Sequence, residues 1–196
     1  MPSNVLDFDE IHMLTVYSYE EAVEEYPDDM KKRKEKVCDD AFSLLVMAYL
    51  MGMRYADNEL GFESELDSNR MFEDIYKKID GKNFEDRVNQ YVEEGHIGEF
   101  VRVVETDSHR LYNDGETHSA DQFTEKYPEM EVMKTWRTML DERVRDTHDY
   151  LEGRTIPYED LFYTYNGDSA FAPGHFGVPE GDINCRRMLK FSATPK

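Results

Sequence analysis

The spacing of apolar residues changes once along this chain, near Val132, and this change limits the folds that the chain can adopt. Before Val132, apolar residues recur every three or four positions, as Met71 and Ile75 do, which is typical of helices with one buried face. After it, short runs of β-branched and aromatic residues are separated by turn residues, which is typical of strands. We therefore expect an α+β fold: a helical unit of about five helices over residues 1–115, then a small α+β module with a short antiparallel sheet over residues 116–196.

The helical unit is predicted to contain one long helix, from about Asp28 to Asn58. Its segment from Ala41 to Met53 is apolar nearly all round but shorter than the roughly twenty residues of a bilayer span. We therefore expect a buried helix, or one packed into a neighbouring subunit. Ahead of it, Ser18 and Glu21 form a capping-box pattern that predicts a short helix ending near Glu25.

Three further helices are predicted after the long one. The first begins at Asp67 or Ser68 and continues to Ile79, where Gly81 ends it. The next begins at the N-cap Asn83, and the last covers about residues 97–112.

Methionines and lysines in the long helix each allow two interpretations. Met47, Met51 and Met53 are able to fill the core or to form a soft surface that binds a partner. A basic run extends from Lys31 to Lys36, but acidic residues bracket it. A basic run suggests phosphate contact, whereas basic residues among acids favour a solvated helix face.

Acidic residues outnumber basic ones, 43 to 23, which gives the chain a formal net charge of −20. This charge opposes contact with a phosphate backbone, so we expect no tight binding to duplex DNA and infer a basic partner or none made of nucleic acid. The acids are spread over the whole chain, which favours a folded protein over a disordered acidic tail. Charge alone supports one hypothesis: an acidic inhibitor or DNA-mimicking protein that occupies a basic site on a host factor.

Cysteine usage and the first residues indicate a protein that stays inside the cell or inside what the cell assembles. Only Cys38 and Cys185 occur, far apart and each beside charged residues, as a reducing cytoplasm permits. Residues 1–12 have no basic region and no apolar run followed by small residues, so we expect no secretion signal. We also expect no membrane association.

The stretch from Trp136 to Arg187 has the most informative spacing in the chain. Asp141 is able to cap a helix that Gly153 ends, and apolar residues give that helix a face to bury. Polar residues follow one another on its flank at steps of three and four: Asp141, Arg145, His148 and Glu152. By itself such a row favours a solvated face.

A longer series of residues in the same stretch is more specific than any short motif. The series is W-x-T-x-x-D-x-R-V-R-x-x-H-x-x-L-x-G, then a strand and PG, then N-C-R. It consists of Trp136, Thr138, Asp141, Arg143, Val144, Arg145, His148, Leu151, Gly153, Pro173, Gly174, Asn184, Cys185 and Arg186. In this series the chain resembles the C-terminal domain of the phage Mu F-like minor head proteins, the head-morphogenesis family.

A second motif lies upstream, and with it the resemblance covers about residues 97–196. Thr106, Asp107 and Arg110 resemble part of the family's R-T-E-x-x-R-x-x-N helix, together with Asn113 and Gly115. Asp107 replaces the usual Glu, and a Glu precedes Thr106 where Arg is usual.

The resemblance implies a minor capsid or head-morphogenesis protein of a tailed phage, with a structural role at the portal or inner capsid in head assembly or DNA delivery. Its partner would be the portal or major capsid protein, and a homo-oligomer is compatible with this role. The implied location is the virion, at the capsid interior or portal vertex, after a stay in the host cytoplasm.

The resemblance also bears on metal binding. Some family members carry C-x-x-C at the positions of Arg145 and His148, and N-C-R-C at the end, which is a zinc-ligand set. Here Arg145 and Arg187 stand at two of the cysteine positions, and arginine does not ligate cations. We therefore expect no zinc and no cofactor. Hydrogen bonds would instead tie the helix to the last strand, through residues Arg145, His148, Asn184 and Cys185.

Catalysis has little support in the sequence. Cys185 and His148 would pair as nucleophile and base, but no residue is identifiable as the orienting group or oxyanion donor. There is no G-x-G-x-x-G and no phosphate-binding loop. We expect no enzymatic activity, with an uncharacterised activity at His148 and Cys185 as the alternative.

Overall fold

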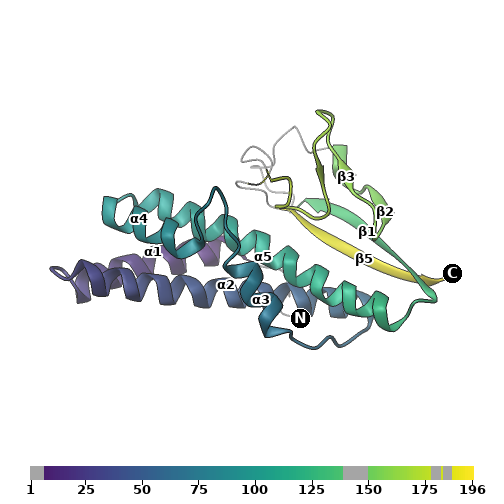
Figure 1. The fold of residues 1–196 in the computed structure, drawn as a ribbon, viewed down its shortest axis with the longest axis horizontal. Coiled ribbons are helices and arrows are strands. Elements are labelled where there is room, and N and C mark those ends of the chain that lie inside the picture. Colours follow the sequence, from purple (N-terminus) through teal and green to yellow (C-terminus); the bar gives the residue numbers. More distant parts are fainter. Residues whose placement is uncertain (1–6, 139–149, 178–181, 183–186) are drawn as a thin grey trace.

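The described part of the chain forms five α-helices followed by antiparallel strands, which confirms the α+β prediction (Figure 1). The computed structural model describes residues 7–138, 150–177, 182 and 187–196. The helices are α1 (Phe8–Glu25), α2 (Met30–Leu60), α3 (Ser68–Ile75), α4 (Phe84–Glu94) and α5 (Ile97–Lys126). The strands are β1 (Met130–Thr138), β2 (Thr155–Pro157), β3 (Phe162–Tyr163), β4 (Ser169–Ala170) and β5 (Arg187–Pro195).

The N-terminal helix is longer than predicted. Its N-cap is Asp7, whose side chain accepts hydrogen bonds from the backbone N–H groups of Asp9 and Glu10. The capping-box prediction at Ser18 is therefore wrong, because Ser18 lies inside α1 and its hydroxyl donates to Asp40 at 2.7 Å.

The long second helix agrees with the prediction. It is capped by Asp29, whose carboxylate accepts from the backbone N–H of Lys32. The basic run at its start contacts acids of its surroundings, as in the pairs Lys34–Glu93 and Lys36–Glu21. Lys31 and Lys32 are exposed, as a solvated face requires, whereas Lys34 and Lys36 are partly buried between helices.

Met47, Met51 and Met53 of α2 all pack against the helical core. Met53 is buried, and Met47 and Met51 are partly buried. This placement is the core filling that the sequence allowed, and a partner-binding use of these residues stays a prediction.

The short helices begin where predicted, at the N-caps Asp67 and Asn83. In α4 the capping box is complete, since Asn83 and Asp86 each bond the other's backbone N–H. The predicted end of the first of them at Ile79 is wrong, because α3 ends at Ile75 and Ile79 pairs with Lys82 in an isolated bridge.

The last helix also differs from the prediction. We expected an end near Tyr112, but α5 continues without interruption to Lys126. The predicted boundary between residues 115 and 116 thus falls inside a continuous helix, which runs beside α2 in the same direction (Figure 1).

The sheet has the strand order β2-β1-β5, with antiparallel pairing throughout. β1 and β5 pair over their whole length, from Met130 opposite Pro195 to Thr138 opposite Arg187. Strands β3 and β4 form a separate two-stranded hairpin. β5 packs on α2 and α5, so the sheet lies along the helical unit (Figure 1).

Buried apolar residues of the described chain gather in two cores. The first lies among the helices and extends along α5 as far as Tyr112; the second takes up α5 again at Ala120 and continues into the sheet. The segment of α5 between them is buried as well, but it is polar. Within the described ranges, no helix is long and apolar enough to span a membrane.

Candidate functional site

The candidate site is a buried polar segment of α5, from Asp107 to Ser119. Every residue in this segment is buried, although most of them carry polar or charged side chains. Burying such groups is costly unless each finds a hydrogen-bond or ionic partner. The partners come from α2, α4 and the C-terminal part of the chain.

His109, Asn113 and Glu116 occupy one face of α5 at steps of four and three, and they bind the backbone at the start of β5. Nε2 of His109 accepts from the N–H of Arg187 at 2.9 Å, and the amide of Asn113 donates to the carbonyl of Arg187 at 3.1 Å. Oε2 of Glu116 accepts from the N–H of Leu189 at 3.1 Å. These three side chains fix the strand to the helix.

Asp107 and Asp114 lie in ion pairs with residues outside the helix. Asp107 accepts from Arg87 of α4 at 2.6 Å. Asp114 lies 2.8 Å from Arg110 and 2.9 Å from His175. Burial acts to raise the pKa of Asp114, but its interactions with His175 and Arg110 outweigh burial and lower that pKa. Asp114 is therefore a carboxylate that joins α5 to the loop after β4.

Glu116 lies in a different environment. Burial raises its pKa well above the usual value, and the hydrogen bond from Leu189 compensates only in part. Its second oxygen, Oε1, has no hydrogen-bond partner among the described residues. A carboxyl group that is protonated on Oε1 and accepts through Oε2 fits this environment.

The backbones of α2 and α5 touch within this segment, at Gly52 and Gly115. A Cβ atom on Gly115 would lie 2.0 Å from the carbonyl oxygen of Tyr49, and one on Gly52 would lie 1.8 Å from that of Tyr112. Only glycine permits such an approach. Beside this crossing, the hydroxyl of Tyr49 lies 2.7 Å from Nδ1 of His118.

Lys134 of β1 is a buried cation in the second core. On its face of the sheet its neighbours are Val132 and Trp136. Its ammonium group donates to the carbonyl of Phe171 at 2.9 Å and lies over the ring of that residue. Burial lowers the pKa of Lys134 to about 7.

The predicted motif residues that the structure describes lie at or next to these contacts. Asp107 and Arg110 are in the ion pairs, whereas the half-buried Thr106 has a hydroxyl without a hydrogen-bond partner among the described residues. Trp136 is fully buried against Phe162, with ring centroids 4.9 Å apart. Gly153 has the positive φ of 73° that a helix stop requires and donates its N–H to the carbonyl of Trp136.

The remaining predicted site residues lie outside the described residues. They are Asp141, Arg143, Arg145, His148, Asn184, Cys185 and Arg186. Their proposed role in tying the helix to the last strand therefore stays a prediction. Among the described residues, no group of three or more His, Cys, Asp or Glu side chains is arranged to hold a metal ion.

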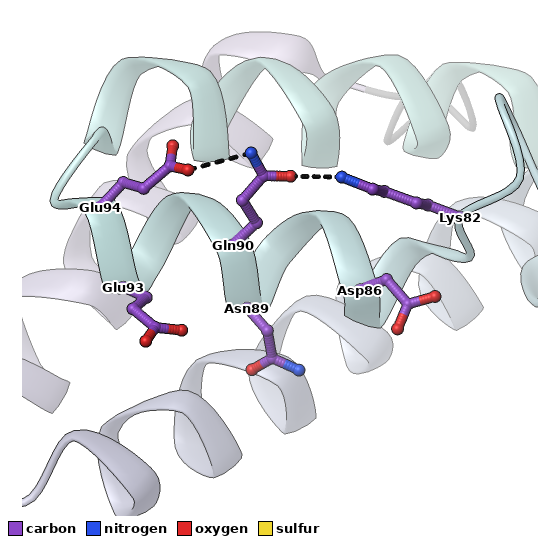
Figure 2. Close-up of a pocket in the computed structure, with 6 residues that line it drawn as sticks. All are labelled: Lys82, Asp86, Asn89, Gln90, Glu93 and Glu94. Carbon is purple, nitrogen blue, oxygen red and sulfur yellow. Dashed lines mark hydrogen bonds between the residues drawn. The ribbon is translucent and has the colours of Figure 1, made fainter.

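A surface pocket of about 380 Å³ lies apart from this segment, on α4 and the turn before it. Figure 2 shows its lining side chains along the helix, where Lys82 donates to Gln90 and Gln90 donates to Glu94. The lining is polar, and its other side chains bind nearby groups, as Glu93 binds Lys34 and Asp86 accepts from the N–H of Asn83. The pocket therefore provides no chemistry beyond that of an ordinary helix surface.

Sequence reasoning missed Glu116 and the contact between Gly52 and Gly115, and it did not foresee the partners of His109 and His175. The polar residues at 109, 113 and 116 repeat at helical spacing, which was a usable signal, but the same spacing is typical of a solvated face. Gly52 and Gly115 are 63 positions apart, and their contact depends on how two helices cross.

Comparison with known proteins gives a family for this arrangement. The family model described as phage Mu protein F like protein matches residues 71–189, a range that contains the whole polar segment. The minor head protein GP7 of Bacillus phage SPP1 is 35% identical over 84 residues, which are 43% of this chain and 26% of that protein. No solved structure matches the chain.

A second relative is named as an enzyme and not as a head protein. The NAD(+)–arginine ADP-ribosyltransferase EFV of Enterococcus faecalis (strain ATCC 700802 / V583) is 27% identical over 146 residues, which are 72% of this chain and 29% of that protein. The chain thus spans less than a third of the length of either curated relative. Because the family model covers more than half of its residues, the chain belongs to the phage Mu protein F-like family.

Proposed function

We propose that this chain is a structural, minor component of a tailed-phage head that acts in head assembly. Membership of the family and the likeness to a minor head protein support this role. The observation that carries this proposal is how the motif residues of α5 are used. Asp107, Arg110 and Asn113 face inward and bind groups of the same chain. Residues used in this way hold a fold together.

The finer part of the proposal concerns place and partners. We place the protein in the virion, at the portal vertex or the inner capsid, after synthesis in the host cytoplasm. Its partner there would be the portal or major capsid protein, and DNA delivery is a second stage at which it would act. A net charge of −20 favours contacts with protein over contacts with packaged DNA.

The test is sedimentation of heads from the phage or prophage that encodes the chain. We expect the protein to co-sediment with assembled heads, and a deletion of its gene to reduce the yield of filled heads until the gene is supplied in trans. A protein that stays in the free fraction, with normal heads after deletion, would contradict the proposal. Stable binding to a basic host protein instead would support the acidic-inhibitor alternative.

We also propose that the chain acts without enzymatic activity. The activity in the name of the Enterococcus relative is a property of that protein, of which the alignment covers 29%. Incubation of the purified chain with NAD⁺ and an arginine-containing acceptor protein is expected to leave the acceptor unmodified. Transfer of ADP-ribose would show that this part of the proposal is wrong.

A further inference from the structure

Helix α1 buries one face and exposes apolar residues on the opposite one. The buried face carries Ile11, Thr15, Ser18 and Ala22, which repeat at helical spacing. On the other side Met13 is 64% exposed, Leu14 40% and Tyr17 62%. We call these three residues, with the acids described next, the α1 outer face.

Carboxylates surround the exposed apolar residues at both ends. Asp9 and Glu10 precede them by one turn, and Glu20 and Glu24 follow within two turns. None of these four carboxylates makes an ion pair or a hydrogen bond with a described residue, and the bonds at Asp9 and Glu10 run from their backbone N–H groups to the side chain of Asp7. By contrast, the neighbouring Glu21 is already engaged, at 2.8 Å from Lys36. The α1 outer face thus has an apolar centre and four carboxylates that no cation of the described chain neutralises.

The charge of this surface selects its occupant. A second copy that bound through the same face would bring carboxylates together, in either orientation of two α1 helices. Nucleic acid and anionic lipid are repelled by the same carboxylates. A helix with one apolar stripe and flanking Lys or Arg residues matches both parts of the surface, because its stripe covers Met13 and Tyr17 while its cations meet the acids.

We propose that the α1 outer face is a docking surface for a basic amphipathic helix of another protein. Met13 adapts its shape to an apolar partner, and Tyr17 is the aromatic anchor, a residue type enriched in binding hot spots. Docking there leaves the polar segment of α5 untouched, so this inference is independent of the proposed function.

A designed peptide is the probe for this surface. It is a helical 18-residue peptide of Leu and Lys with Leu at every third or fourth position, which gives one apolar stripe and a net positive charge. The control peptide has the same composition in an order that spreads Leu around the helix. Fluorescence anisotropy of each labelled peptide, titrated with the full chain at about 150 mM salt, measures the affinity without strong contributions from distant charges.

Three variants of the chain separate the apolar contribution from net charge. One carries Met13→Ser and Tyr17→Ser, and the second carries Glu10→Gln, Glu20→Gln and Glu24→Gln. The matched control also removes three negative charges, at exposed acids outside α1: Glu125→Gln, Glu129→Gln and Glu131→Gln. Circular dichroism checks that each variant keeps the helical content of the parent.

We expect the striped peptide to bind the parent chain, with about tenfold weaker binding to each of the first two variants and a change of no more than about twofold for the control variant. Equal binding of the striped and scrambled peptides, or an undiminished affinity of the Met13 and Tyr17 variant, would overturn the proposal. So would a self-association of the parent chain that this variant abolishes, because a second copy would then be the occupant.

Discussion

Glu116 and Lys134 show at the scale of single residues how this fold uses ionisable groups inside its core. Both side chains are buried, and burial favours the neutral form of each: it raises the pKa of Glu116 and lowers the pKa of Lys134. Their effects on stability have opposite pH dependence, because one group binds a proton to become neutral and the other releases one. Unfolding measurements over pH are therefore able to distinguish them.

Replacing Glu116 by glutamine is expected to flatten the pH dependence of stability between pH 5 and 7. In the parent chain the folded state keeps the proton that the unfolded state releases above its ordinary pKa. The contribution of this group is therefore fully present below that pKa, and it falls by up to about 1.4 kcal/mol per pH unit above it. Glutamine needs no proton and keeps an acceptor for the N–H of Leu189.

Urea unfolding at several pH values measures the slope of stability against pH. Glu125→Gln, at an exposed position of the same helix, is the control, and parallel profiles of parent and Glu116→Gln would contradict the prediction.

Replacing Lys134 by methionine is expected to act on the alkaline side. The pKa of Lys134 is lowered to about 7, so the folded parent chain gains stability as the pH rises from about 7 toward the ordinary lysine pKa. Lys134→Met should lack this gain, so its stability relative to the parent is highest at pH 7 and declines toward pH 9. Lys190→Met changes an exposed lysine of β5 and should leave the slope unaltered. A Lys134→Met profile that follows the Lys190→Met profile would count against the assignment.

Helix α5 is the element on which the two cores depend. Its apolar ends belong to different cores, and its polar middle holds α2, α4 and β5 at the same time. The caps at Asp67 and Asn83 and the strand at Val132 were predictable because each is a local signal. The length of α5 was not, because Asn113, Asp114 and Gly115 form a turn pattern that contacts far away in the sequence override. A local pattern likewise does not tell whether a polar helix face meets water or another part of the chain.

Replacing Gly115 by alanine is expected to destabilise the protein by about 1–3 kcal/mol, because the new methyl group meets a backbone carbonyl that is unable to rotate away. Gly98→Ala, on the same helix with no atom within 4 Å of the added Cβ, is the matched control. It should give between no change and a gain of about 1 kcal/mol. Chemical denaturation of both variants measures the difference. Equal stabilities of the two variants would contradict the prediction, because they would show that α2 and α5 move apart at Gly115 without a cost in stability.

At the scale of the whole molecule, charge governs which surfaces the protein meets. The net charge of −20 is distributed over both the helical unit and the α+β module. Long-range repulsion keeps such a molecule away from polyanions until a specific contact is made. Partner choice then depends on local surfaces such as the α1 outer face.

Binding to duplex DNA is accordingly expected to be weak at physiological salt. The phosphate contacts that supply non-specific affinity require clustered cations, and the basic run at the start of α2 already contacts acids such as Glu93 and Glu21. A gel shift at about 150 mM salt should show no complex up to about 10 µM protein. A retarded band at nanomolar protein would refute this expectation.

The pairing of β1 with β5 determines when the molecule is complete during synthesis. The partners of β1 in β5 lie from 49 residues later (Thr138 to Arg187) to 65 residues later (Met130 to Pro195), and His109, Asn113 and Glu116 bind the same strand. The helices make mostly earlier contacts and are able to form first. Strands that are far apart in the sequence pair slowly, because the entropy of closing the loop between them is lost before the pairing contacts form. Until β5 is made, the polar side chains of α5 that bind it and one edge of β1 lack the partners that they have in the folded protein, and the one strand supplies both.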